Sequence, residues 1–270
     1  MTSRRSTSPN SETKQRKQRT SAVSKVSAEI AVLSDIHSNL HALEAVMAEC
    51  KRRKINRFVC LGDIVGYGAR PAECLKLIRS LKCPTVIGNH DFYVAHEETS
   101  GDLNEYAQAG VEYSISQLNT AAKKWLRDLP EVIIADTVTL VHSSLPEPLD
   151  WDYIFDSGDA RQTMLAQSTP LCFYGHTHVP KLFVQSGAPT PEAVGELKFR
   201  FSREGRYLIN PGSVGQPRGG GDPRARFAVF HPVEMTVEFV QIEYDVEGAA
   251  EAIREAGLPE FLAERLMAGV

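Results

Sequence analysis

Short apolar runs alternate with amphipathic stretches along the first third of the chain. Apolar runs at Ile30–Leu33, Phe58–Leu61 and Thr85–Ile87 predict three strands. Between them, residues 39–53 and 71–81 repeat apolar side chains at the three- and four-residue spacing of an amphipathic helix. This β-α-β-α-β order predicts a sheet with helices packed on its face.

The pattern changes beyond residue 104. Residues 104–128 predict a mostly helical segment, strands dominate from residue 132, and residues 246–267 predict a final helix. We also expect a short helix near residues 159–167. The expected strands are Val132–Ala135, Val138–Val141, Leu171–Tyr174, Lys181–Val184, Lys198–Phe201, Arg206–Ile209, Arg226–Phe230 and Met235–Ile242. We therefore expect a single α/β domain over residues 29–270, with two sheets and the helices outside.

Charge is unevenly distributed along the chain. The whole sequence carries a net charge of −4, whereas residues 1–27 hold seven basic side chains and one acidic one, which leaves −10 for the rest. We expect residues 1–28 to form a disordered basic tail, with a loose contact to an acidic partner as the alternative. The acidic charge of the remaining residues disfavours stable nucleic-acid binding.

The apolar and cysteine content indicates a cytoplasmic protein with no membrane partner. No stretch approaches the roughly 20 apolar residues that span a membrane, and no apolar leader follows the basic start. The five cysteines are odd in number and form no Cys-x-x-Cys pair. Such usage is typical of a reducing compartment.

Polar clusters follow the strands at the points where the apolar runs stop. They are Ser34-Asp35-Ile36-His37, Gly62-Asp63, Gly88-Asn89-His90-Asp91, His142, Gly175-His176-Thr177-His178 and Asn210-Pro211-Gly212-Ser213. In α/β sheets, ligands bind beyond the carboxyl ends of the strands. Strands of two packed sheets can therefore bring all these side chains to one rim.

The residue types in these clusters suit divalent metal ions. The candidate ligands are Asp35, His37, Asp63, Asn89, His142, His176 and His178. Mixed nitrogen and oxygen ligands favour Mn²⁺, with Fe, Zn²⁺, Co²⁺ or Ni²⁺ as alternatives, over Ca²⁺ and Mg²⁺. Two such cations can clamp a phosphate and acidify a water for in-line attack. The departing alkoxide also needs an acid, and the candidate is His90, oriented by Asp91.

The order of these clusters resembles the calcineurin-like metallophosphoesterase superfamily. The resemblance runs from about residue 30 to residue 242. It implies a four-layer α/β/β/α sandwich with two mixed β-sheets around a dinuclear centre, in which His90 contacts the scissile phosphate. By position, one metal ion would bind Asp35, His37, Asp63 and His178, and the other would bind Asp63, Asn89, His142 and His176.

The segment Gly62–Gly68 bears on the substrate. Protein phosphatases of this superfamily carry Gly-Asp-x-Val-Asp-Arg-Gly, whereas this chain has Gly-Asp-Ile-Val-Gly-Tyr-Gly and lacks the Asp-Arg pair. Together with Ile209–Arg218, this segment resembles the small prokaryotic phosphodiesterase-like branch. The resemblance implies hydrolysis of a small phosphodiester or a nucleotide by metal-bound hydroxide, with a phosphomonoesterase or protein phosphatase as the alternative.

Two side chains outside the ligand set are candidates for substrate contacts. Arg218, and less directly Arg224, can meet a phosphate with the guanidinium fork, and the alternative is pairing with acidic neighbours such as Asp222. Asn39 lies close to the first cluster, and its alternative role is helix capping.

Two further functions are compatible with such a fold. One is a non-catalytic scaffold, as in a retromer subunit of similar fold that lacks the catalytic histidine, and the other is a DNA nuclease. The presence of His90 disfavours the scaffold, and the acidic charge of the chain disfavours the nuclease. The sequence leaves the oligomeric state open.

Overall fold

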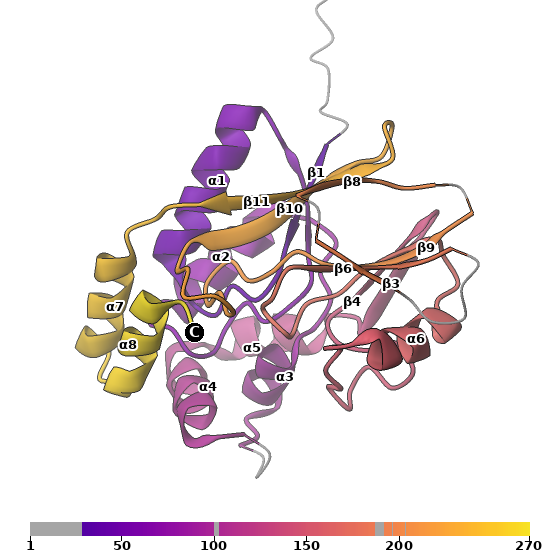
Figure 1. The fold of residues 1–270 in the computed structure, drawn as a ribbon. Coiled ribbons are helices and arrows are strands. Elements are labelled where there is room, and N and C mark those ends of the chain that lie inside the picture. The colour runs from indigo at the N-terminus through magenta and orange to yellow at the C-terminus, as the bar shows by residue number, and fades with distance from the viewer. Residues whose placement is uncertain (1–28, 100–102, 187–191, 196, 203) are drawn as a thin grey trace, which may run out of the picture.

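The computed structural model describes residues 29–99, 103–186, 192–195, 197–202 and 204–270 (Figure 1). Its helices are α1 Leu40–Arg53, α2 Pro71–Leu81, α3 Asn89–His96, α4 Glu105–Gln117, α5 Thr120–Arg127, α6 Ser157–Ala166, α7 Val246–Glu255 and α8 Glu260–Ala268. Its strands are β1 Ile30–Leu33, β2 Arg57–Cys60, β3 Val132–Ala135, β4 Val138–Val141, β5 Leu171–Phe173, β6 Lys181–Gln185, β7 Glu192–Val194, β8 Lys198–Arg200, β9 Arg206–Asn210, β10 Ala225–His231 and β11 Thr236–Ile242. The basic tail predicted for residues 1–28 lies outside the described residues.

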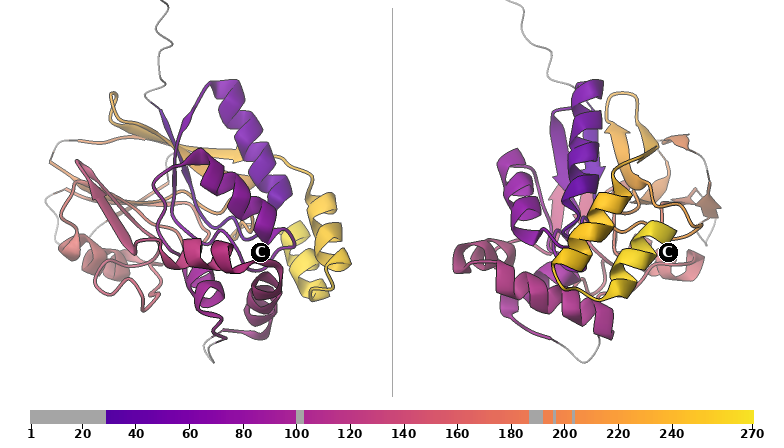
Figure 2. Two further views of the ribbon diagram at one scale, coloured as in Figure 1. Left: turned by 180° about the vertical axis from the view of Figure 1, so that it is seen from behind. Right: turned by 90° about the vertical axis from the view of Figure 1, so that its left-hand side faces the viewer.

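The strands form two mixed sheets that pack face to face. The first has the order β2-β1-β10-β11-β8, and the second has the order β3-β4-β5-β9-β6-β7. Strands β1 and β2 are parallel, as are β4, β5 and β9, whereas the other pairs are antiparallel. Helices α1 and α2 cover the outer face of the first sheet, and α6 covers that of the second (Figures 1 and 2). This is the four-layer α/β/β/α sandwich expected from the sequence.

Side chains alternate between layers along the central strands. On β1, Leu33 packs beneath the helices, whereas Val32 packs between the two sheets. On β5, Phe173 lies between the sheets, whereas Cys172 faces α6. Because successive side chains of a strand point to opposite faces, strands that are buried on both faces have continuous apolar sequences. This explains why the short apolar runs predicted the strands.

Two predicted helices are each divided in the structure. Residues 104–128 contain α4 and α5, because Leu118 is extended and Asn119 caps the second helix with its side chain. Residues 246–267 contain α7 and α8, because Gly257 adopts a φ of 69° beyond the end of the first helix. An asparagine N-cap and a left-handed glycine are local signals that a helix starts or stops.

The strand predicted at Thr85–Ile87 does not join a ladder. Thr85 forms a single parallel bridge with Cys60, and the N–H of Ile87 then donates to Pro130 O. The chain leaves the sheet here and enters α3, which the sequence did not predict because its polar first turn has no apolar periodicity. Strand β7 was not predicted either.

Candidate metal centre

The predicted ligands follow strands whose carboxyl ends meet at one edge of the sandwich. Asp35 and His37 follow β1, and Asp63 follows the parallel strand β2. His142 follows β4, and the segment His176–His178 follows the parallel strand β5. Because parallel strands end on the same side of a sheet, each sheet delivers its ligands to the shared edge.

The donor atoms form two groups that share Asp63. The ligand atoms of Asp35, His37, Asp63 and His178 lie within 4.8 Å of one another, as do those of Asp63, His142 and His176. Asn89 joins the second group, since its Oδ1 lies 3.1 Å from His142 Nε2. None of the seven side chains is more than 8% exposed. The structure therefore brings together all seven residues that the sequence singled out.

Five of these seven residues have a left-handed backbone conformation. The angle φ is 53° at Asp35, 46° at His37, 52° at Asp63, 67° at His176 and 62° at His178. Such conformations cost about 1–3 kcal/mol each for residues with a Cβ and persist only where the surroundings enforce them. Here hydrogen bonds join the loops, including one from His37 N–H to Asp63 O at 2.9 Å.

Two ring nitrogens face each other within the first group. His37 Nδ1 lies 3.1 Å from Val65 O, and His178 Nδ1 lies 2.7 Å from Gln216 O. Each Nδ1 must carry the hydrogen to donate to its carbonyl, so each Nε2 presents a lone pair. The two Nε2 atoms lie only 3.0 Å apart. Two facing lone pairs repel each other at this distance, and a shared cation would turn the repulsion into attraction.

The histidine rings of the second group are also held by the backbone. His142 Nδ1 lies 2.7 Å from Leu61 O, and its Nε2 lies 3.4 Å from Asp63 Oδ2. His176 is hydrogen-bonded to the backbone of Trp151. A backbone carbonyl that fixes the far ring nitrogen of a histidine is the common outer shell of a metal site.

Unpaired polar atoms test whether a cation fits. Asp35 Oδ2 and His176 Nε2 are buried and have no hydrogen-bond partner among the described residues. A buried polar atom without a partner costs about 1–3 kcal/mol. His176 belongs to the second ligand group, so a metal ion bound there would satisfy its Nε2. Asp35 turns its other oxygen, Oδ1, toward His37 and His178. The mixed nitrogen and oxygen donors suit transition metal ions of the Mn²⁺, Fe or Zn²⁺ type.

The electrostatics of Asp63 and of three histidines favour metal binding, whereas those of His142 oppose it. Burial lowers the pKa of His176 to about 3 and holds the pKa values of His37 and His178 well below the usual range. Burial alone would raise the pKa of Asp63, but the charge of His142 and of other histidines brings it below its usual range. Neutral imidazoles and an ionised carboxylate are the forms that bind metal ions. Burial lowers the pKa of His142, but the charge of Asp63 raises it to about 9, so His142 must release a proton when a metal ion binds.

His90 lies at the start of α3 beside the ligand groups. Its backbone N–H donates to Asp63 Oδ1 at 2.9 Å, and its ring lies 4.8 Å from that of His37 and 4.5 Å from that of Tyr67. Burial lowers the pKa of the His90 imidazole to about 4. The ring lines the mouth of the site, where a substrate would enter.

The hydrogen bonds of Asp91 differ from the predicted ones. Its Oδ1 accepts from the N–H groups of Ile64 and Val65 at 2.9 and 3.2 Å, and its Oδ2 accepts from Gly88 N–H at 3.3 Å. Both oxygens are therefore used by the backbone of two ligand-bearing loops, not by the ring of His90. Asp91 is a positioning residue that holds these loops together.

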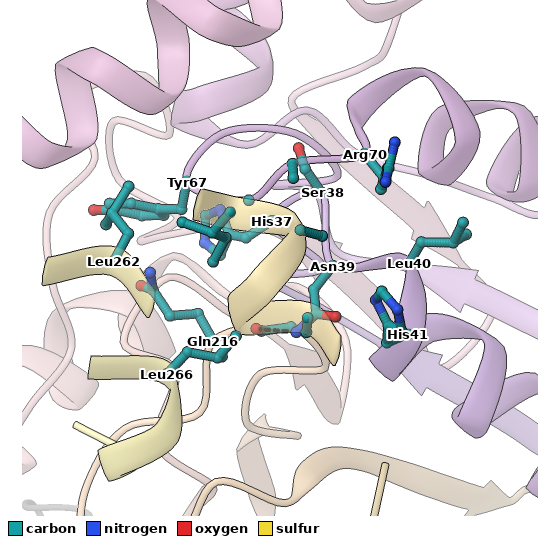
Figure 3. A pocket seen from close by; sticks show the side chains of 16 residues that line it. His37, Ser38, Asn39, Leu40, His41, Tyr67, Arg70, Gln216, Leu262 and Leu266 are labelled. Atoms are coloured by element: carbon teal, nitrogen blue, oxygen red, sulfur yellow. Dashed lines mark hydrogen bonds between the residues drawn. The ribbon is translucent and has the colours of Figure 1, made fainter. Parts of the chain in front are cut away.

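The side-chain amide of Asn39, which we predict to contact the substrate or to cap a helix, forms hydrogen bonds within the protein. Its Oδ1 accepts from Ala42 N–H, so it caps α1, the alternative considered for it. Its Nδ2 donates to Gly215 O at 2.9 Å and to Tyr244 Oη at 3.2 Å. Figure 3 shows the side chain directed at the loop that carries Gln216. Asn39 thus ties α1 to this loop behind the ligand groups.

Comparison with known proteins agrees with this geometry. A model of the calcineurin-like phosphoesterase superfamily domain matches residues 29–234. The chain belongs to this superfamily. The resemblance inferred from the order of the motifs is thus confirmed. With its two buried groups of histidines and aspartates, this family member is a metal-dependent phosphoester hydrolase.

Relatives of this phosphoesterase cover nearly the whole chain. An uncharacterised protein of Methanocaldococcus jannaschii is 40% identical over 245 residues, which are 89% of this chain and 98% of the relative. The crystal structure of a metallophosphoesterase from Sphaerobacter thermophilus is 41% identical, with a TM-score of 0.78 over 90% of this chain and 99% of its own. A hypothetical protein of Pyrococcus horikoshii shares the fold at 21% identity, with a TM-score of 0.74 over 90% and 98% of the two chains.

The arginines at the phosphoesterase site differ in their surroundings. Arg218 lines the mouth with His90, its Nη2 donates to Gln216 Oε1 at 2.9 Å, and its Nε is buried without a hydrogen-bond partner among the described residues. Arg224 pairs with Asp222, with Nη2 and Oδ2 2.6 Å apart. The alternative of acidic pairing therefore holds for Arg224, and Arg218 stays the candidate for a phosphate contact.

One residue at the mouth of the phosphoesterase site was missed in the sequence. Tyr153 lines the mouth and stacks on His176, with ring centroids 4.0 Å apart and planes at 20°. It follows β4 in a loop without regular structure, where the sequence pattern does not predict which side chains face the site. The available signal was the alternation of aromatic residues at Trp151, Tyr153 and Phe155, ahead of the next helix.

Two further properties of this phosphoesterase concern its cysteines and its helices. All five cysteines are free, and four of them are buried, so none of them belongs to a disulfide. Among the helices of the described residues, none has both the length and the apolar character that a membrane span requires.

Proposed function

We propose that this phosphoesterase hydrolyses phosphodiesters at a centre of two divalent cations. The proposal rests on two ligand groups that share Asp63, with the Nε2 atoms of His37 and His178 facing each other at 3.0 Å. The seven buried side chains surround two points with lone pairs that are not matched by hydrogen atoms. Positive charge between them would satisfy the whole set.

Each ligand group would hold one cation. Asp35, His37, Asp63 and His178 would hold the first, and Asp63, Asn89, His142 and His176 would hold the second. Two cations bound there would polarise the phosphoryl oxygens and acidify the attacking water. Mn²⁺ is our first choice for this mixed ligand set, with Fe, Zn²⁺, Co²⁺ and Ni²⁺ as alternatives.

His90 is proposed to protonate the leaving alkoxide. Its backbone is fixed to Asp63, and Gly66 packs against its ring so closely that a Cβ on Gly66 would lie 2.3 Å from His90 Nδ1. Burial holds the pKa of the free imidazole at about 4. An anionic phosphate beside the ring favours the protonated form. The imidazolium can then transfer its proton to the departing oxygen.

The charge of the mouth supports a diester as the substrate. Among the described residues that line the mouth, Arg218 is the one arginine, and there is no lysine. Gly66 and Tyr67 stand where protein phosphatases of this superfamily carry the Asp-Arg pair. A phosphate monoester carries about −1.5 to −2 charge at neutral pH, whereas a diester carries a single negative charge. The two cations would face either ester, so the difference lies in the side chains around them, and one guanidinium there suits the lower charge.

Hydrolysis of two chromogenic esters in Mn²⁺ tests the proposal. We expect a higher kcat/KM for bis-p-nitrophenyl phosphate than for p-nitrophenyl phosphate. Asp63→Asn should reduce it by more than about 100-fold, since even outer-shell partners of metal ligands are worth 10- to 100-fold. Asp128→Asn is the control, because Asp128 is exposed and outside both ligand groups. Cleavage of the monoester alone would indicate a phosphatase, and no turnover with any cation would contradict hydrolysis.

A further inference from the structure

Three aromatic rings form a continuous stack that leads out of the metal centre. Tyr153 stacks on His176 at 4.0 Å, and Phe155 stacks on Tyr153 at 5.0 Å with an angle of only 9° between their planes. The stack begins at a buried ligand and ends at the surface, because Tyr153 is 45% and Phe155 is 59% exposed. The rings thus connect the candidate reaction centre with solvent.

The loop that carries these rings is anchored on both sides. Ile154, between the two aromatic residues, is 2% exposed and packs in the cluster beneath α6. Trp151 adopts a φ of 58°, and its ring lies 6.1 Å from that of His142 at 72°. Since alternate residues of an extended segment point to opposite sides, burying Ile154 turns Tyr153 and Phe155 away from the core.

The exposure of the stack is not explained by packing within the chain. Single exposed apolar residues are ordinary on protein surfaces. Here, however, two exposed rings lie nearly parallel, and the inner one shares the mouth of the site with His90 and Arg218. Tyr153 is covered by His176 on one face and by Phe155 on the other, so the outer face of Phe155 is the one open to a planar base. Stacking on an aromatic face is the usual means of binding such a base, and a guanidinium fits the phosphate attached to it.

We propose that the outer face of Phe155, supported from behind by Tyr153, binds the aromatic base of a nucleotide-like phosphodiester. This inference rests on the proposed diesterase function and names the substrate class for the same site. A ring bonded directly to the phosphate would not reach past Tyr153 to this face. A base that is separated from the phosphate by a sugar reaches the second ring spacing, at Phe155. The phosphate lies between the ligand groups and Arg218.

Calorimetric binding to the Mn²⁺-loaded protein tests this without turnover of a diester. The probes are adenosine 5′-monophosphate, ribose 5-phosphate and phenyl phosphate. We expect the adenosine nucleotide to bind more tightly than ribose 5-phosphate. Base stacking on an aromatic side chain is worth about 1–3 kcal/mol, or about 5- to 150-fold in Kd. Phe155→Ala should remove this preference, and Phe155→Trp should retain it.

Leu165→Ala provides the matched control. Leu165 lies on α6 and is 64% exposed, so its loss tests for a general effect of removing an exposed apolar side chain. It should leave the preference for the base unchanged. Equal binding of the nucleotide and ribose 5-phosphate by the wild type would overturn the proposal, as would a preference that survives Phe155→Ala. Tighter binding of phenyl phosphate than of the nucleotide would also overturn it.

The two proposals can fail separately. If the base preference is absent while bis-p-nitrophenyl phosphate is still cleaved, the aromatic stack is not a base site, but the diesterase function stands. If the preference is present and no diester is cleaved, the stack binds nucleotides and the diesterase function is wrong.

Discussion

At the scale of single residues, backbone conformation and ligand chemistry are coupled. Five of the seven candidate ligands have positive φ, although only glycine adopts this region without cost. These conformations turn the side chains at the strand exits toward a common centre. Alternative exits with ordinary φ values would be less strained, and hydrogen bonds between the loops, such as that from His37 N–H to Asp63 O, hold the strained ones in place.

His90 is the residue whose role can be separated from metal binding. It lies in neither ligand group, so His90→Ala should leave the metal content unchanged. Loss of a general acid lowers kcat by about 10²–10⁴-fold. The loss should be larger for a diester with an alkoxide leaving group than for a p-nitrophenyl ester, because nitrophenolate leaves without a proton. Steady-state kinetics with the two esters measure this difference.

The control for this prediction lies on the same helix. His96, at the end of α3, packs against Phe92 with ring centroids 4.1 Å apart, and its Nδ1 lies 2.9 Å from Phe92 O. His96→Ala should therefore not change kcat. An equal loss for both esters in His90→Ala would show that the residue does not protonate the leaving group.

At the scale of elements, α1 connects the site to the far end of the first sheet. Its first turn is capped by Asn39 behind the ligand groups. Its last turn carries Arg53, which bonds Glu49 on the same helix and Glu238 on β11, both through atoms less than 3 Å apart. The helix is thereby fixed at both ends relative to the loops that hold the site.

This ion pair gives the fold a defined dependence on pH. Hydrogen bonds from Arg52 and Arg53 lower the pKa of Glu49 to about 2, from an unperturbed value of 4.5. The ionised form is favoured by folding, so its stabilisation is complete above pH 4.5 and is lost as the pH falls toward 2. Glu49→Gln should thus lower the free energy of unfolding at pH 7 and match the wild type near pH 2.

Urea unfolding at several pH values provides the measurement. Glu44→Gln is the control, since Glu44 is an exposed carboxylate on the same helix. The effect of Glu49→Gln should be modest, because Arg52 is largely exposed and solvent screens the pair. A difference between Glu49→Gln and the wild type that stays constant from pH 7 to pH 3 would contradict this account.

The elements also show what the sequence can predict. Strands such as β1 and β5 were found because burial on both faces gives an unbroken apolar run. Thr85–Ile87 has the same pattern, yet its backbone turns to Pro130, a partner distant in sequence. The break near Asn119 was marked by a local cap, which the apolar periodicity on both sides concealed.

In the candidate site, too, local sequence signals could be recognised, whereas contacts between distant segments could not. The seven candidate ligands could be singled out because each follows an apolar run in a short motif, and the order of the motifs is specific. The distant partners of Asp91 and Asn39 were not predicted, because those hydrogen bonds join loops 26 or more residues apart in sequence. Tyr153 was missed because its stacking on His176 depends on how a long loop folds over β4 and β5.

At the scale of the whole molecule, the site depends on both sheets. The first sheet supplies Asp35, His37 and Asp63, and the second supplies His142 and the segment His176–His178. Asp63 joins them, since its Oδ2 lies 3.5 Å from His37 Nε2 and 3.4 Å from His142 Nε2. Cations bound to these groups would link the two halves of the sandwich and should stabilise the fold by mass action.

The most direct test of the account is the number of metal ions per chain, measured by elemental mass spectrometry on protein purified after Mn²⁺ loading. We expect about two ions in the wild type, as in other two-metal hydrolases. His176→Ala should retain about one, because His176 belongs only to the second group, and Asp63→Ala should retain less than one. His41→Ala, outside both groups, should retain two. A single ion in the wild type, or two ions in Asp63→Ala, would contradict a shared dinuclear centre.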